Sequence, residues 1–232
     1  MDTTRVLDTI PDRLPQAVTI ETEQVRLPGI LTLPPHPGGI VLFAHGSGSS
    51  RFSERNRFVA DVLVRANFGT LLFDLLTEAE AQDRANVFDI LLLAERLRRA
   101  TAWVGAYPAT ADLAVGYFGA STGAAAALVA ATGAPAVRAI VSRGGRPDLA
   151  GDFLPRVRAP TLLIVGGADF EVLELNRVAL MRLGGTRRLV VVPGATHLFE
   201  EAGALENVAG LATFWFGRHL GAAAAAPARK AS

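Results

Sequence analysis

Residues 115–133, "VGYFGASTGAAAALVAATG", contain four glycines, a serine next to a threonine, and no charged side chain. The charge-free stretch around them runs from residue 113 to residue 137, which on hydropathy alone is long enough to span a bilayer. However, Pro135, the glycine-rich centre and the lack of flanking aromatic or basic clusters favour a short strand followed by a small-residue helix. We therefore expect these residues to be buried inside a globular protein that has no membrane partner.

The composition of the 232-residue chain favours a small-molecule substrate. Half of the residues are apolar, so the chain can bury a large core within one domain. The 23 Lys and Arg residues nearly balance the 22 Asp and Glu residues, so no general field attracts nucleic acid or anionic lipid. We expect no nucleic acid partner, and either a monomer or a homodimer.

The chain contains no cysteine, which excludes disulfides, thiolate metal sites and cysteine nucleophiles together. The first sixteen residues mix acids and bases without the apolar core of a secretory signal, which points to a cytoplasmic protein. Residues 221–232 have no periodic apolar face, and we expect them to form a flexible C-terminal tail. The rest, residues 1–220, is expected to be a single domain.

Apolar runs of strand length alternate with helical patterns along the chain. Strands that are apolar throughout are typical of a parallel sheet covered on both faces. The runs lie at residues 39–44, 70–73, 113–118, 139–142, 161–165 and 189–192. The helical patterns lie at residues 54–67, after the N-cap Ser53, and at 86–107, 122–132, 172–183 and 205–220. With an antiparallel hairpin at residues 17–21 and 25–34 on one edge, this predicts a doubly wound, mostly parallel α/β sheet of about eight strands.

Residues suited to chemistry follow four of these runs. Ligands of doubly wound sheets bind beyond the carboxyl ends of the strands. The four segments are "HGSGSS" at 45–50, "GASTG" at 119–123, "GGAD" at 166–169 and "PGATH" at 193–197. We expect these segments to meet at one edge of the sheet.

The segment at 119–123 matches the G-x-S-x-G nucleophile elbow, and the chain resembles the α/β-hydrolases. Ser121, Asp169 and His197 follow in the chain order of that superfamily. The resemblance covers residues 29–220, and the compact size without a large lid is most similar to the dienelactone hydrolase group. That group characteristically uses a cysteine nucleophile, where this chain has Ser121. The resemblance implies an α/β-hydrolase fold and an esterase that acts on a carboxylic ester or lactone.

The resemblance implies a catalytic role for each of the three residues. A serine hydroxyl needs an adjacent base, so His197 would take the proton of Ser121 and later donate it to the leaving group. Asp169 would hold the tautomer of His197 and stabilise its imidazolium. Other interpretations remain open: a helix-capping Ser121, a surface His197 and an N-capping Asp169. Glu171 and Asp148 are rival candidates for the acid.

The resemblance also places an oxyanion hole at two backbone N–H groups, those of Ser47 and Thr122. Gly46 or Gly48 is the alternative to Ser47, because the glycine-rich loop has several possible turns. For His45, directly after a strand, we expect a structural hydrogen bond within this loop rather than proton transfer.

Substrate contacts are expected from the loops at the strand ends. Arg143 either binds an acidic group of the substrate or forms a salt bridge with Asp148 or Asp152. The side chains expected to line an apolar acyl or alcohol pocket are Phe52, Leu75, Leu76, Phe153, Leu198 and Phe199. Because only a short segment follows Arg143 before the next strand, we expect an open pocket.

Motifs for nucleotides and metals do not match the sequence. The glycines do not fit G-x-G-x-x-G, no phosphate-loop motif occurs, and no two histidines have zinc-ligand spacing. Glu200 and Glu201, close to His197, are interpreted as charges at the start of a helix. We therefore predict a serine hydrolase without metal or cofactor. The alternatives are an acyltransferase, a phosphotriester hydrolase or a non-catalytic binding protein on the same scaffold.

Overall fold

The computed structural model describes residues 14–22 and 25–221. Residues 1–13, 23–24 and 222–232 lie outside this part, and they include all of the expected tail at 221–232 except Gly221. Eight strands form one sheet in the order β1-β2-β4-β3-β5-β6-β7-β8. Their bounds are β1 (Gln16–Glu21), β2 (Arg26–Thr32), β3 (Ile40–Ala44), β4 (Gly69–Phe73), β5 (Val115–Ala120), β6 (Val137–Arg143), β7 (Thr161–Gly166) and β8 (Arg187–Val192).

The strand directions confirm the doubly wound, mostly parallel sheet. Strands β3 to β8 pair in parallel, whereas β1 and β2 form an antiparallel hairpin that joins the sheet through β4. The helical segments are α1 (Glu54–Arg65), η1 (Glu80–Gln82), α2 (Arg84–Phe88), α3 (Ile90–Ala106), α4 (Thr122–Ala130), η2 (Pro147–Arg156), α5 (Phe170–Arg182) and α6 (Ala204–Leu220).

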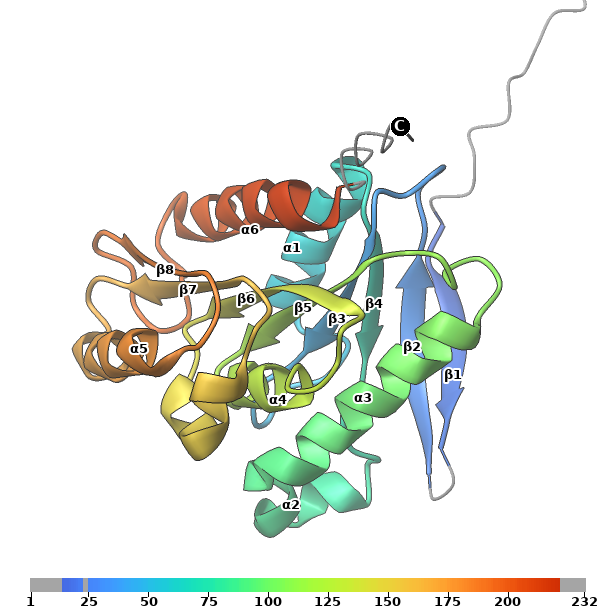
Figure 1. Cartoon of the computed structure of the whole chain (residues 1–232), viewed down its shortest axis with the longest axis horizontal. Helices are drawn as coiled ribbons and strands as arrows, with labels where there is room; N and C mark the ends of the chain where they lie inside the picture. The colour runs from blue at the N-terminus through green and yellow to red at the C-terminus, as the bar shows by residue number, and fades with distance from the viewer. Residues whose placement is uncertain (1–13, 23–24, 222–232) are drawn as a thin grey trace, which may run out of the picture.

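Helices cover both faces of the sheet (Figure 1). One face packs against α1 and α6, and the other packs against α3, α4 and α5. Alternate residues of β3 show why the strand is apolar throughout. Val41 and Phe43 pack into the core on the side of α1 and α6, whereas Leu42 packs into the core on the side of α3 and α4. A polar residue at any of these positions would be buried without water.

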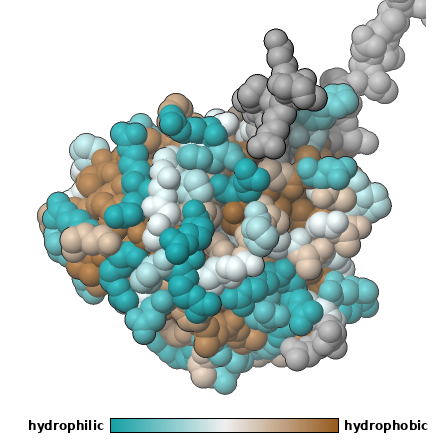
Figure 2. Space-filling view, viewed as in Figure 1, coloured by the Kyte–Doolittle hydropathy of each residue, from teal (hydrophilic) through white to brown (hydrophobic). Residues whose placement is uncertain are grey.

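The charge-free stretch forms β5, the elbow turn and α4, as the sequence predicts. All residues of β5 and α4 are buried, which explains the absence of charge there. Within residues 14–22 and 25–221, no helix is long and apolar enough to cross a membrane. Hydrophilic and hydrophobic residues are interspersed on the face seen in Figure 2.

The single helix predicted at residues 86–107 is wrong in extent, because the chain forms two helices, α2 and α3. Asp89 separates them with φ −76° and ψ 89°, and its carboxylate accepts a hydrogen bond from the Leu92 N–H at 3.0 Å. This N-cap satisfies a backbone donor that would otherwise lack a partner, so α3 starts anew at Ile90. Leu91, in the first turn of α3, is exposed.

Candidate active site

Ser121 lies on a sharp turn between β5 and α4. Its φ of 50° and ψ of −122° are rare for a residue with a side chain, so the turn is strained. Two glycines allow the strand and helix to approach: a Cβ on Gly119 would lie 2.5 Å from the Ala124 Cα, and one on Gly123 would lie 2.1 Å from the Ala44 carbonyl oxygen. The Ser121 side chain makes no capping hydrogen bond to α4. The helix-capping interpretation is therefore wrong.

An acid–histidine pair forms at the neighbouring strand ends. Asp169 follows β7 and His197 follows β8, and the Asp169 Oδ2 lies 2.7 Å from the His197 Nδ1. Because a carboxylate only accepts, Nδ1 carries the proton and donates it, which leaves Nε2 as the basic nitrogen. The Asp169 carboxylate does not cap α5, so its side chain serves the histidine rather than the helix.

The imidazole packs beside the chain segment that adjoins Ser121. The Ser121 N–H donates to the Arg143 carbonyl at 3.3 Å, and the next residue, Gly144, faces the histidine. A Cβ on Gly144 would lie only 3.5 Å from the His197 Nδ1. Among the described residues the Ser121 hydroxyl has no hydrogen-bond partner, His197 included. Catalytic hydrogen bonds of this kind often form only when substrate is bound.

Of the three candidate acids, Asp169 is the one that bonds to His197. Asp148 instead accepts two hydrogen bonds from the Arg146 guanidinium, at 2.9 and 2.8 Å. This pairing raises the pKa of Arg146. Glu171 lies in the first turn of α5.

Residues 193–203 form the loop after β8 that carries His197, which we call the histidine loop. It is held by contacts that the sequence does not reveal. The Ala168 N–H donates to the Ala195 carbonyl at 2.9 Å, which joins the acid loop to the histidine loop. The Glu201 carboxylate accepts a hydrogen bond from the Thr196 N–H at 3.0 Å. Interaction with the Thr196 side chain, with smaller contributions from the backbone N–H groups of Glu201 and Thr196, lowers the pKa of Glu201.

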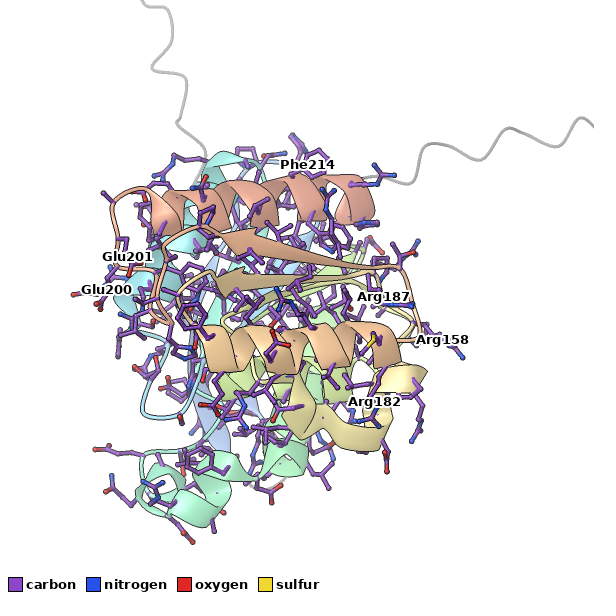
Figure 3. All side chains as sticks on the ribbon, turned by 90° about the vertical axis from the view of Figure 1, so that its left-hand side faces the viewer. Arg158, Arg182, Arg187, Glu200, Glu201 and Phe214 are labelled. Carbon is purple, nitrogen blue, oxygen red and sulfur yellow. The ribbon has the colours of Figure 1, made fainter. Side chains whose placement is uncertain are left out.

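The interpretation of Glu200 and Glu201 as charges at a helix start is wrong, because α6 begins later, at Ala204. Glu201 holds the histidine loop, and Glu200 pairs with Arg55 at 3.4 Å. Figure 3 shows both glutamates at the carboxyl edge of the sheet, opposite the edge that carries Arg187.

The loop after β3 approaches the nucleophile turn closely. A Cβ on Gly46 would lie 3.0 Å from the Ser121 Cβ, so this position requires glycine. The Ser47 N–H, an expected oxyanion donor, donates to the Thr122 Oγ1 at 3.0 Å. Thr122 is the first residue of α4, where backbone N–H groups lack intrahelical partners. The structure thus leaves the Thr122 amide free for a ligand and occupies the Ser47 amide.

His45 has the structural role that we expected. Its Nε2 accepts a hydrogen bond from the Leu75 N–H at 3.1 Å, and its Nδ1 lies 3.0 Å from the Gly46 carbonyl. A backbone N–H can only donate, so the ring is the neutral tautomer with the proton on Nδ1. Burial lowers the pKa of His45 and stabilises this neutral form.

His45 should make the protein less stable in mild acid. Below about pH 6.5 the unfolded chain protonates this histidine while the folded protein, with its lowered pKa, does not. The free energy of unfolding should therefore be unaffected by His45 above this pH and fall below it, by at most about 1.4 kcal/mol per pH unit. Urea unfolding of wild type and His45→Gln between pH 5.0 and 7.5 measures the difference. His219, whose pKa burial also lowers, is common to both proteins, so parallel pH profiles would contradict the prediction.

A cavity of about 890 Å³ opens beside residues 45–50, the loop after β3. Ser47 and Thr122 line the end nearest the nucleophile, and the ion-paired Arg51 and Asp74 lie in its wall. Of the predicted apolar contacts, Phe52, Leu75 and Leu76 line this cavity, whereas Phe153, Leu198 and Phe199 do not. Phe199, which belongs to the histidine loop, is instead buried in the core.

Arg143 is buried without a carboxylate partner. The two expected salt bridges are absent from the described part of the chain, because Asp148 bonds to Arg146 and Asp152 bonds to Arg182. The guanidinium of Arg143 lies over the Phe199 ring, 6.0 Å from its centroid. Burial, with a smaller contribution from the nearby charge of Arg55, lowers the pKa of Arg143 to about 10, so this side chain remains a cation at neutral pH.

Comparison with known proteins agrees with this architecture. No family model matches the chain. The crystal structure of dienelactone hydrolase from Anabaena variabilis is 56% identical, with a TM-score of 0.87, and the match covers 89% of this chain and 98% of that one. The structure of Est1E from Butyrivibrio proteoclasticus shares the fold, with a TM-score of 0.74 at 15% identity over 87% of this chain and 98% of that one.

Curated relatives from Mycobacterium tuberculosis, with the provisional name phosphoribosyl transferase, are 63% identical over 206 residues, which is 88% of this chain. The chain spans only 46% of their length, so that name belongs to the longer proteins. The Anabaena enzyme, by contrast, matches over nearly its whole length. The chain therefore belongs to the dienelactone hydrolase family, on the α/β-hydrolase fold.

Proposed function

We propose that the protein is a serine hydrolase that cleaves carboxylic esters or lactones through an acyl-enzyme. The observation that carries the proposal is the juxtaposition at one sheet edge of two features: a strained Ser121, whose hydroxyl has no hydrogen-bond partner among the described residues, and a His197 that is hydrogen-bonded to Asp169 at 2.7 Å. A capping or core role explains neither of these two features, and acyl transfer to serine requires both of them.

The residues would divide the reaction as follows. The Nε2 of His197 takes the hydroxyl proton while the Ser121 Oγ attacks the substrate carbonyl, whose π electrons move onto oxygen. The tetrahedral intermediate collapses, the C–O bond to the alcohol breaks, and His197 protonates the departing alkoxide. Water then attacks the acyl-enzyme by the same route and regenerates Ser121. Throughout, Asp169 stabilises the imidazolium, and the Thr122 N–H donates to the oxyanion.

The proposed nucleophile is a serine instead of the cysteine that the resemblance leads us to expect in this group. Catalysis would therefore depend more strongly on the Asp169–His197 pair. A serine hydroxyl is far less acidic than a thiol, so its proton has to leave as the new bond forms. The short Asp169–His197 contact supports this demand, because the carboxylate orients the imidazole and fixes its tautomer.

The proposal is tested by ester turnover and by active-site labelling. Purified protein should release p-nitrophenol from p-nitrophenyl acetate and butyrate, and a fluorophosphonate probe should label the peptide that contains Ser121. Added alcohols separate hydrolysis from acyl transfer. A hydrolase releases the free acid in an amount equal to that of p-nitrophenol, whereas an acyltransferase forms the ester of the added alcohol. A folded protein that neither turns over esters nor takes up the probe would instead be a binding protein on this scaffold.

The buried and unpaired Arg143 supports an anionic group on the substrate. An isolated buried cation is costly, and a substrate carboxylate would compensate it. We expect Arg143→Met to lower kcat/KM for the p-nitrophenyl hemiester of succinate by about 10- to 100-fold, the range of one charged hydrogen bond. Turnover of the neutral butyrate ester should stay within about threefold, because that ester makes no ion pair.

Arg182→Met is the matched control, because it removes an exposed arginine that pairs with Asp152. Neither ester should respond to it. Equal losses on the charged and the neutral ester in Arg143→Met would show that Arg143 supports the fold rather than binding an anion.

A further inference from the structure

The hydrogen bond between the Ser47 N–H and the Thr122 Oγ1, 3.0 Å long, joins positions 75 residues apart in the chain. It lies where the loop after β3 meets the nucleophile turn, and both residues line the 890 Å³ cavity. An N–H that already donates at this distance cannot also donate fully to an oxyanion. Of the two backbone donors that the resemblance implies, only the Thr122 N–H then remains free, in a position where acyl transfer requires more than one.

The hydroxyl of Thr122 can supply the second hydrogen-bond donor to the oxyanion. One lone pair of its oxygen accepts the Ser47 N–H, which leaves the hydroxyl proton to donate. Among the described residues this hydroxyl donates no hydrogen bond. Thr122 is only 4% exposed, yet it lines the cavity, so a ligand in the cavity could accept a hydrogen bond from this hydroxyl. A buried donor without a partner costs free energy, which a ligand oxygen would recover.

We propose that the side-chain hydroxyl of Thr122 is a catalytic oxyanion donor, working beside the N–H of the same residue. The inference rests on the proposed serine hydrolase chemistry and adds a second donor to it. Ser47 then acts through Thr122: its N–H polarises the hydroxyl and holds it in place. As the bond between the Ser121 Oγ and the carbonyl carbon forms, both donors of Thr122 bond to the carbonyl oxygen, and no proton is transferred.

Four features suit Thr122 to this role. The residue directly follows Ser121, so the distance between nucleophile and donor is fixed by covalent geometry. It begins α4, whose N-terminal dipole favours negative charge. Its hydroxyl receives a hydrogen bond from Ser47, and a hydroxyl that accepts a bond donates a stronger one. A β-branched side chain also has few rotamers, which keeps the donor aimed.

The test compares three variants of Thr122 on p-nitrophenyl butyrate. Thr122→Val removes the hydroxyl at nearly constant shape and should lower kcat by about 10²- to 10³-fold, the effect of losing one oxyanion donor. KM should change by less than about threefold, because the donor acts on charge that develops after binding. Thr122→Ser keeps the hydroxyl and should stay within about fivefold of wild type. Thr122→Ala removes the hydroxyl with a smaller side chain, in case the valine variant fails to fold.

A different result is expected if Ser47 is the direct donor and Thr122 only occupies it. In that case Thr122→Val frees the Ser47 N–H for the oxyanion, and kcat stays at the wild-type value or rises. That outcome overturns the inference. A trifluoromethyl ketone analogue gives an independent readout, because it forms a tetrahedral oxyanion on Ser121. Its Ki should rise in Thr122→Val by the same factor by which kcat falls, whereas the Ki of the matching methyl ketone should not.

The two levels of proposal fail in distinguishable ways. If the hydrolase proposal is wrong, wild-type protein shows no turnover and does not bind the trifluoromethyl ketone covalently. If only the role of the hydroxyl is wrong, wild type and Thr122→Val turn over esters equally and bind the trifluoromethyl ketone with the same Ki.

Discussion

Ser121→Ala should lower kcat for p-nitrophenyl butyrate by at least about a thousandfold, because it removes the only atom that bonds covalently to the acyl group. The residual rate reflects binding and the oxyanion donors alone. Labelling by the fluorophosphonate probe should disappear with activity. Stopped-flow release of p-nitrophenol measures both the burst of acylation and the steady state, and the variant should show no burst and only the residual steady-state rate.

The fold should survive this change, which makes the loss of activity interpretable. The Ser121 hydroxyl has no hydrogen bond within the described residues, so its removal leaves no partner unsatisfied. The melting temperature should remain within about 3 °C of wild type, a shift that corresponds to roughly 1 kcal/mol for a chain of this size. Activity that persists in the alanine variant would assign the nucleophile elsewhere and remove the basis for the mechanism.

Gly123→Ala should destabilise the protein by about 3 kcal/mol or more, the largest stability effect that we expect from a single methyl group. Its Cβ would lie 2.1 Å from the Ala44 carbonyl oxygen and 2.5 Å from the His45 carbonyl oxygen. Both atoms belong to the backbone of β3 and its following loop, so no rotamer change relieves the overlap. Helix α4 has to move away from the sheet and carry Ser121 with it. Thermal unfolding should show a fall of about 10 °C.

Gly210→Ala is the matched control for this substitution. Gly210 lies exposed in the middle of α6, and a Cβ there would have no neighbour within 4 Å. Alanine in a helix interior is favoured over glycine by about 1 kcal/mol, so this variant should be slightly more stable than wild type. Similar destabilisation of both variants would show that the close approach of α4 to β3 does not limit stability.

Much of the fold follows from the sequence, because its determinants are local. The uninterrupted apolar character of β3 and β5 reports burial on both faces, and the glycines around Ser121 report a tight turn. The break between α2 and α3 was missed for an equally local reason. Asp89 suits both a helix surface and an N-cap, and the apolar spacing continues across it.

The site is harder to predict where side chains choose between partners. The sequence brings Asp148 and Asp152 close to Arg143, yet Arg146 and Arg182 take them in the structure. Likewise, nothing in the sequence of residues 45–50 indicates that the Ser47 N–H donates to a side chain 75 residues away. Such pairings depend on the directions of side chains at strand ends, which residue spacing does not encode.

The backbone contacts between the loops after β7 and β8 have a consequence for how the family can change. The Ala168 N–H bonds to the Ala195 carbonyl, and a Cβ on Gly166 would lie 2.2 Å from that same oxygen, so acid and imidazole are mounted as one rigid part. Ser121 lies on a different turn, at the end of β5. A change in the length of the loop after β7 or after β8 would therefore displace Asp169 and His197 together, so the two loops can change only in concert.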